Sequence, residues 1–483
     1  MSHKKILSLF NAAVKHVAGR IQSYVYKPGH DFTRGGKLPA EKMLSFLVSQ
    51  GSSSTKNELN QAFSFSDSRP SESAFVQKRA KLKPEAFEEV FHHFNRSVDT
   101  LRPSDNYRFL AADGTTVSYL SKPSFSPPEY HTNRGDSEKG CYSMHINALY
   151  DLDSNRYTDA LIQPIRYQDE FAAFCSMVDR HPVPEKTSLV FIGDRGYCSY
   201  NTMAHVIQKK QFFLFRAKDI DSKGLLHHID FPKTDTFDVP VKLILTRKQS
   251  KKMVLPDGYV RYIGKDTSFD FLEYGSSDFF ELSFRVVRLK LSKDTVDSMN
   301  SDTDHTENSQ ANDSTPSNTI DAKNHKTIAS ANSETDQNSY EALITNLPLG
   351  AFPPDHLKEL YNRRWGIESS FRDLKYSVGL TRFHASKPLF IQQEIWARLI
   401  SYNFTSAIVS FVHIPNADRK YTYKVSFSAA ISICRNFLRS PPSTSSPVLL
   451  LARELIPIRP DRSFPRLKTA HFRRPAYFIY RPA

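Results

Sequence analysis

Four residues between positions 361 and 375 combine side chains suited to phosphate chemistry with helical spacing. Tyr361, Arg364, Glu368 and Lys375 follow one another at intervals of three, four and seven residues. At about 100° per residue, all four fall within an arc of roughly 60° on one edge of a helix. A carboxylate that binds Mg²⁺ beside cations that hold phosphate is what phosphoryl transfer requires. The alternative is a solvated helix edge with ion pairs four residues apart, such as Arg364–Glu368.

Two aspartates elsewhere in the chain favour the chemical role. Asp113 ends an apolar run that starts at Phe109, and Asp194 ends another that starts at Leu189. An aspartate after a strand is often only a turn former or a helix cap. Together with Glu368, however, they make three carboxylates that would repel one another at a shared site unless a cation neutralised them. Hard oxygen ligands of this kind favour Mg²⁺ or Mn²⁺.

The surrounding pattern predicts the elements that would position these residues. Strands are expected at 107–116, 141–151, 156–164, 188–192 and 212–217, with helices at 169–180 and 200–208 between them. This order predicts a mixed α/β sheet. Residues 353–378 are expected to form one long helix that stops at Gly379. Its apolar stripe would pack on the sheet and leave the edge that carries Glu368 exposed. The stripe consists of Ile367, Phe371, Leu374 and Val378.

The rest of the chain divides by composition. The first 104 residues favour helices, at 38–48, 56–63 and 84–94. Residues 219–292 alternate large apolar side chains and are expected to be β-rich. The segment 293–338 is almost free of apolar residues, so it is predicted to be a disordered loop. Further helices are expected at 391–412 and 426–438, followed by a tail in which eight Lys or Arg face two acids from Arg453 onward.

The charge balance favours a polyanionic partner. The chain has 65 Lys and Arg against 51 Asp and Glu, a formal net charge of +14. The segment 293–338 contains nine acids and three Lys, which leaves +20 on the remainder. Nucleic acid is the most plausible partner for such a protein.

Cysteine usage and hydropathy bound the compartment. The four cysteines form no C-x-x-C pair and have no zinc-ligand spacing, so reduced thiols are expected. No secretory signal and no apolar run of about 18 residues stands out, so no membrane span is expected. In a bacterial cell this favours the cytoplasm and its nucleoid.

The motifs together resemble a known family. The residues Tyr361, Arg364, Glu368 and Lys375 match the Y-(2)-R-(3)-E-(6)-K signature of bacterial insertion-sequence transposases of the insertion-sequence-four family. Asp113-Gly-Thr and Asp194-Arg-Gly-Tyr are similar to that family's two preceding acidic motifs, in the same order. The resemblance covers roughly residues 30–440, and the signature of four residues is its most specific part.

The resemblance implies a ribonuclease-H-like catalytic core with a β-rich insertion, plus a helical N-terminal domain. It implies that Asp113, Asp194 and Glu368 hold two Mg²⁺ ions, with Mn²⁺ able to substitute. Tyr361, Arg364 and Lys375 would contact phosphates of double-stranded DNA, both at the terminal inverted repeats and at the target. A homodimer assembled on DNA is expected. Transposition would then proceed by cleavage at the element ends and strand transfer.

Two other functions stay open on the sequence alone. One is a metal-dependent nuclease of the same fold that does not join DNA, and the other is a DNA-binding relic with a dead site.

The predicted domains are a helical DNA-binding domain (1–104), the first part of the core (105–219), an insertion with its disordered loop (220–350), the second part of the core (351–440) and a basic tail (441–483).

Overall fold

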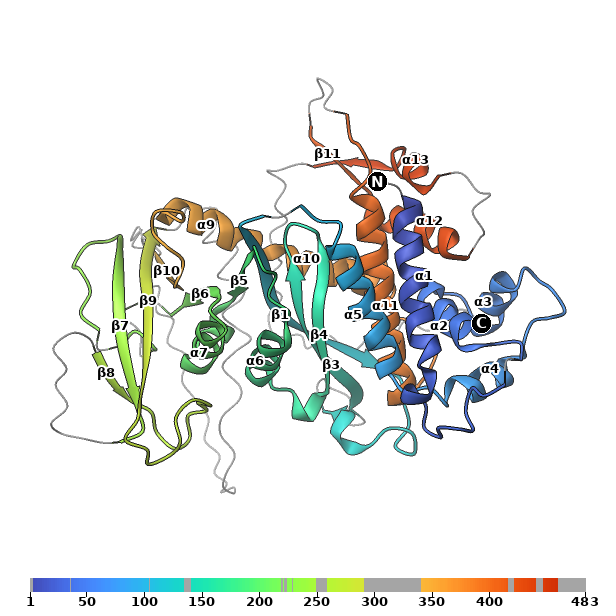
Figure 1. The fold of residues 1–483 in the computed structure, drawn as a ribbon, viewed down its shortest axis with the longest axis horizontal. Coiled ribbons are helices and arrows are strands. Elements are labelled where there is room, and N and C mark those ends of the chain that lie inside the picture. Colours follow the sequence, from blue (N-terminus) through green and yellow to red (C-terminus); the bar gives the residue numbers. More distant parts are fainter. Residues whose placement is uncertain are drawn as a thin grey trace, which may run out of the picture.

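The computed structural model describes residues 3–458, apart from 35, 104, 134–139, 219, 221–223, 228, 249–258, 291–339, 416–420 and 440–445. Within those residues the fold is mixed α/β, as predicted, with one large sheet and helices on both of its faces (Figure 1). The predicted loop 293–338 and the part of the basic tail beyond residue 458 lie outside the described residues. None of the described helices is long and apolar enough to cross a membrane.

Ten strands of the described chain form the large sheet, in the order β2-β3-β1-β5-β6-β10-β9-β7-β8, with β4 off this path and paired to β3 beyond β2. Their bounds are β1 Tyr107–Tyr119, β2 His131–Thr132, β3 Cys141–Asp151, β4 Arg156–Pro164, β5 Ser188–Gly193, β6 Phe212–Ala217, β7 Phe237–Thr246, β8 Tyr259–Tyr262, β9 Phe279–Lys290 and β10 Tyr340–Thr345. A separate ribbon pairs β11 (Tyr423–Val425) with β12 (Leu455–Pro457). The strands of the predicted insertion therefore extend the same sheet as the predicted core.

The helices are α1 His3–Gly19, α2 Ala40–Ser49, α3 Thr55–Ala62, α4 Glu72–Arg79, α5 Glu85–Asp99, α6 Glu170–Arg180, α7 Tyr200–Gln208, α9 Pro354–Arg363, α10 Trp365–Tyr376, α11 Pro388–Val409, α12 Phe427–Arg439 and α13 Pro447–Leu451. Short 3₁₀ turns occur at Ile21–Tyr24, Pro128–Tyr130, Ile165–Tyr167 and Arg195–Tyr197. Several starts are capped as the sequence suggests. Asp169, for example, accepts a hydrogen bond from the Ala172 amide at the start of α6.

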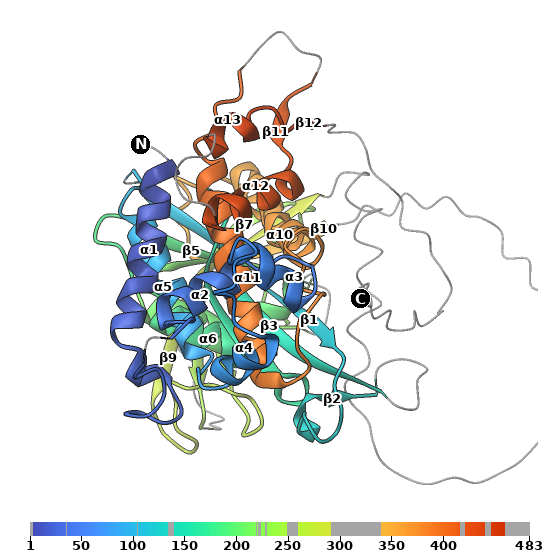
Figure 2. The ribbon, with the colours of Figure 1, turned by 90° about the vertical axis from the view of Figure 1, so that its right-hand side faces the viewer.

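Apolar side chains form three clusters that assign the helices to the faces of the sheet. One cluster joins α1, α2 and α5 to α10, α11 and α12 and to one face of β1, β3 and β4. The second buries α6 and α7 against the opposite face. The third packs α9 on β5, β6, β9 and β10. Figure 2 shows the N-terminal helices beside α11, so segments far apart in the sequence share one core.

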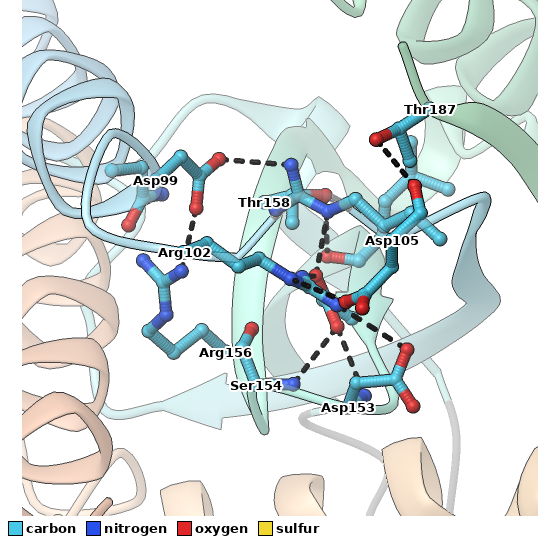
Figure 3. A network of polar contacts seen from close by, with 12 residues as sticks. Asp99, Arg102, Asp105, Asp153, Ser154, Arg156, Thr158 and Thr187 are labelled. Atoms are coloured by element: carbon cyan, nitrogen blue, oxygen red, sulfur yellow. Dashed lines mark hydrogen bonds and ion pairs between the residues drawn. The ribbon is translucent and has the colours of Figure 1, made fainter. Parts of the chain in front are cut away.

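An ion-pair network fixes the end of the sheet from which β1 starts (Figure 3). Asp151, at the end of β3, is fully buried and accepts hydrogen bonds from Arg108 and Arg102. Asp99, at the end of α5, pairs with Arg108 and with Arg156 of β4. The two arginines hold the pKa of Asp151 down to about 2 although burial opposes this. The network therefore anchors β1, which carries Asp113, to its neighbours.

Candidate active site

Asp113 and Asp194 come together through the register of two neighbouring strands. β1 and β5 are parallel, and their last recorded pair is Ala111 with Ile192. Two residues further along each strand lie Asp113 and Asp194. Since adjacent strands are about 4.8 Å apart, the two aspartates stand side by side at the end of β5. Asp194 follows β5 as predicted, but Asp113 lies within β1, which continues to Tyr119 paired with β3.

Both aspartates belong to the face of the sheet that α9 and α10 cover. Successive side chains of a strand alternate between faces, so Asp113 shares a face with Ala111 and Asp194 shares one with Ile192. Ala111 packs in the cluster that contains α10, and Ile192 packs in the cluster that contains α9. The two helices therefore pass over the pair of aspartates.

The predicted long helix is broken at Arg364, which is a correction to the sequence analysis. α9 ends at Arg363 and α10 starts at Trp365. At the break the amide of Arg364 donates a hydrogen bond to the carbonyl of Tyr361, and the amide of Ile367 donates one to the carbonyl of Arg364. These hydrogen bonds span three residues instead of the four of an α-helix. The apolar stripe on α10 is buried as predicted.

Arg364 lies among the acidic groups and not on an exposed edge. Its side chain is 7% exposed, and Nη1 lies 2.9 Å from Glu368 Oε1. Burial alone would lower the pKa of the guanidinium. The neighbouring acidic groups outweigh burial and raise the pKa of Arg364 above its ordinary value. These groups are Tyr361, Glu368, Asp113 and Asp194. The prediction of an exposed position was wrong for Arg364 because it ignored the sheet beneath, whereas the Glu368 side chain is 34% exposed.

Asp113 has a strongly raised pKa. Burial raises its pKa to about 7; Arg364 opposes that rise, while Glu368 and Asp194 add to it. Asp113 therefore lies near both other predicted carboxylates, and Arg364 lies near all three. Among the described residues, however, no three His, Cys, Asp or Glu side chains converge closely enough to hold one ion. The donor types fit Mg²⁺ or Mn²⁺, but the side chains are spread around a guanidinium.

The other two signature residues also lie beside this acidic centre. Tyr361 is buried, and burial raises its pKa to about 12. Its ring lies 5.6 Å from the Arg364 guanidinium carbon. Lys375 is half-buried; burial lowers its pKa, and the nearby Asp113 opposes that effect. These six residues lie near one another, and their roles in catalysis and DNA binding stay predictions.

Comparison with known proteins decides the family. A family model described as a transposase DDE domain matches residues 104–404, more than half of the chain. The chain belongs to this family. A transposase for insertion sequence element IS4 of Escherichia coli strain K12, InsG, is 28% identical over 130 residues. That match covers 24% of this chain and 28% of the relative, so the chain spans under a third of that relative's length. The family model and this relative together make the chain an insertion-sequence-four-type DDE transposase by family.

One solved structure is also similar to the transposase. It is a complex of piggyBac transposase with hairpin DNA, and the likeness covers 94% of this chain and 84% of that one. The identity is 9% and the TM-score is 0.41. A likeness this weak carries no argument about the present chain.

The chain contains a buried polar residue near the acidic centre to which the sequence analysis assigned no role. Tyr197, quoted only as part of a motif, is 2% exposed, and its phenol oxygen has no hydrogen-bond partner among the described residues. Burial raises its pKa well above the ordinary value, and Asp113 and Glu170 add to that rise. Its place next to Asp194 in the chain was the signal that could have found it.

On the other face of β1, Gly114 is closely covered by polar side chains. A Cβ added to Gly114 would lie 2.5 Å from His145 Nε2 and 2.8 Å from Glu170 Oε1. His145 is buried, with Nδ1 3.2 Å from Thr116 Oγ1. The Gly114 amide donates to the carboxylate of Asp113 at 2.8 Å. The strand therefore accepts only glycine beside Asp113 without rearrangement.

Proposed function

We propose that this transposase cuts DNA at the ends of a mobile element and joins the freed ends to target DNA. The observation that carries the proposal is the grouping of Asp113, Asp194 and Glu368, from three distant segments, around Arg364. Phosphoryl transfer needs carboxylates and cations at one site, and groups with strongly shifted pKa values often mark such sites.

The proposal includes a ribonuclease-H-like core. Antiparallel β1, β3 and β4, followed by β5 and β6 parallel to β1, with helices on both faces, support it. The proposed division of the chain is a helical DNA-binding domain (1–104), a core in two parts (105–219 and 351–440), an insertion (220–350) and a basic tail (441–483).

The carboxylates would hold two Mg²⁺ ions, for which Mn²⁺ can substitute. Bound ions of this type lower the pKa of an attacking water and stabilise a leaving 3′ oxygen. Arg364 and Lys375 would hold the phosphates on either side of the reacting bond, and the buried ring of Tyr361 would support Arg364. Hydrolysis breaks the bond to the 3′ oxygen and frees a 3′ hydroxyl. That hydroxyl then attacks a phosphodiester of the target, so that one ester bond replaces another.

The proposed partners are double-stranded terminal repeats and target DNA, held by a homodimer because two ends must be joined together. The basic composition supports binding to DNA, and the site of action would be the bacterial nucleoid.

The test uses DNA that flanks the coding sequence of this protein. Linear fragments with the flanking repeats would be incubated with the full-length protein, Mg²⁺ and a supercoiled target plasmid. The proposal expects cleavage at the repeat ends and covalent joining to the plasmid. Cleavage without joined products would identify a nuclease, and the absence of metal-dependent cleavage would identify a DNA-binding relic.

A further inference from the structure

Arg364 lies beside the three carboxylates that would hold metal ions. Its guanidinium pairs with Glu368 at 2.9 Å and interacts electrostatically with Asp113 and Asp194. The side chain is almost fully buried, so water screens these interactions little. Its Nε is buried without a hydrogen-bond partner among the described residues. The guanidinium is therefore held by charge more than by a complete set of hydrogen bonds.

A metal ion and Arg364 would compete for the same oxygens. Mg²⁺ binds oxygen at about 2.1 Å with strict geometry, and the Glu368 oxygen that faces Arg364 cannot serve both cations fully. A dication placed beside an unmoved guanidinium would also be repelled, by an amount that low solvent exposure makes large.

Two aromatic rings lie beside Arg364. It follows directly on the last turn of α9, and its guanidinium carbon lies 4.9 Å from the ring of Trp365 and 5.6 Å from that of Tyr361. Both rings can stabilise the cation when its pairing with Glu368 is lost. A DNA phosphate at the site would offer a bidentate partner that replaces Glu368.

We propose that Arg364 is the resident counter-ion of the acidic centre and that DNA phosphate withdraws it, so that metal and DNA bind cooperatively. This inference rests on the proposed function. Arg364 keeps the three carboxylates together while the protein searches for DNA, and it limits metal binding until a phosphate is present. By linkage, the factor by which DNA strengthens metal binding equals the factor by which metal strengthens DNA binding.

Arg363 provides a matched control. It is the preceding residue and carries the same charge, but it is half-exposed and pairs with Asp153 of the β3–β4 turn. Arg363→Ala therefore removes one positive charge from the same helix without touching the acidic centre.

The experiment measures Mn²⁺ binding to the full-length protein from the free-ion electron paramagnetic resonance signal, with and without a short duplex DNA. Without DNA, Arg364→Ala should bind Mn²⁺ roughly ten- to a hundredfold more tightly than wild type, the equivalent of one charge-assisted pair. Arg363→Ala should behave as wild type. DNA should tighten Mn²⁺ binding by wild type and leave Arg364→Ala unchanged.

Thermal melting covers the case in which the variant folds poorly. Removing Arg364 leaves the carboxylates to repel one another, so Mn²⁺ should raise the melting temperature of Arg364→Ala more than that of wild type or Arg364→Lys. Equal or weaker Mn²⁺ binding by Arg364→Ala, or equal melting shifts, would overturn the inference while leaving the metal site intact. Absence of Mn²⁺ binding by every variant would instead refute the proposed metal site, and this inference with it.

Discussion

Asp113 and Asp194 stand at the same level of the sheet, two residues beyond the parallel pair Ala111–Ile192. β5 ends there, whereas β1 continues to Tyr119. The two carboxylates therefore lie at the carboxyl end of β5, on the face of the sheet that α9 and α10 cover. Active sites of α/β sheets commonly lie at the carboxyl ends of parallel strands. This relationship fixes where the chemistry can occur, and the predictions below depend on it.

Gly114→Ala should damage the site from the opposite face of β1. The new Cβ would meet His145 Nε2, which Thr116 holds in place, so β1 must shift beside Asp113. We expect a loss of about 1–3 kcal/mol in unfolding free energy, typical of an overpacked core, together with weaker cleavage. Gly264→Ala is the control because nothing lies within 4 Å of its Cβ position. Equal stability of the two variants in a urea titration would contradict this prediction.

Lys375→Ala should weaken binding to element-end DNA while keeping the fold. Lys375 is half-buried and lies seven residues after Glu368 on α10, whereas Arg372 on the same helix is exposed. Loss of one phosphate contact should reduce the slope of log affinity against log salt concentration by about one. Fluorescence anisotropy at several salt concentrations measures that slope. If Arg372→Ala changes it by the same amount, the effect is one of general charge and the proposed role of Lys375 fails.

His181 should make the protein acid-sensitive between pH 6.5 and 4. Burial lowers the pKa of His181 to about 4, and Arg108 lowers it further. A base with a depressed pKa in the folded state is neutral there, so its contribution to stability is present above pH 6.5 and is lost as the pH falls toward 4. A shift of this size corresponds to about 3 kcal/mol at most. His181→Gln should flatten the dependence of the melting temperature on pH in this window, and an unchanged profile would contradict the assignment.

Replacement of residues 293–338 by a six-residue Gly/Ser linker should preserve fold and cleavage. Lys290 of β9 pairs with Tyr340 of β10, so the two strands can be joined by a short connection. Shortening the connection between Lys290 and Tyr340 about fivefold should stabilise the protein by up to roughly 1.5 kcal/mol through loop-closure entropy. Removal of nine acids should also tighten nonspecific DNA binding at low salt. A variant that melts normally but does not cleave would show that the segment has a catalytic role.

Local pattern predicted most of the elements around the site. The strands Cys141–Asp151 and Arg156–Pro164 and the helix Tyr200–Gln208 have the bounds expected from the sequence, because their apolar periodicity is clear and turn residues end them. The helix His3–Gly19 was not predicted, although Ile6, Phe10 and Val17 have helical spacing. Its signal was present in the sequence and was overlooked.

Features that depend on contacts across the fold were not predictable in this way. Helical spacing showed that Arg364 and Glu368 share an edge, but it could not show that the sheet buries Arg364 among three acids. No proline marks the break at Arg364. The pairing of β9 with β10, which adds the insertion to the core sheet, also depends on which strand edges meet. Sequence pattern identifies a strand more readily than its neighbour.

The most direct test of the account is a strand-transfer assay with single carboxylate variants. Asp113→Asn, Asp194→Asn and Glu368→Gln keep side-chain size and remove one charge each, and Asp373→Asn does the same on another side of α10. Since metal-assisted charge stabilisation is worth several kcal/mol, each of the first three should reduce both cleavage and joining by about 10³-fold or more, with Asp373→Asn close to wild type. Joined products at near wild-type yield from any of the three, with Mg²⁺ present, would contradict the central claim.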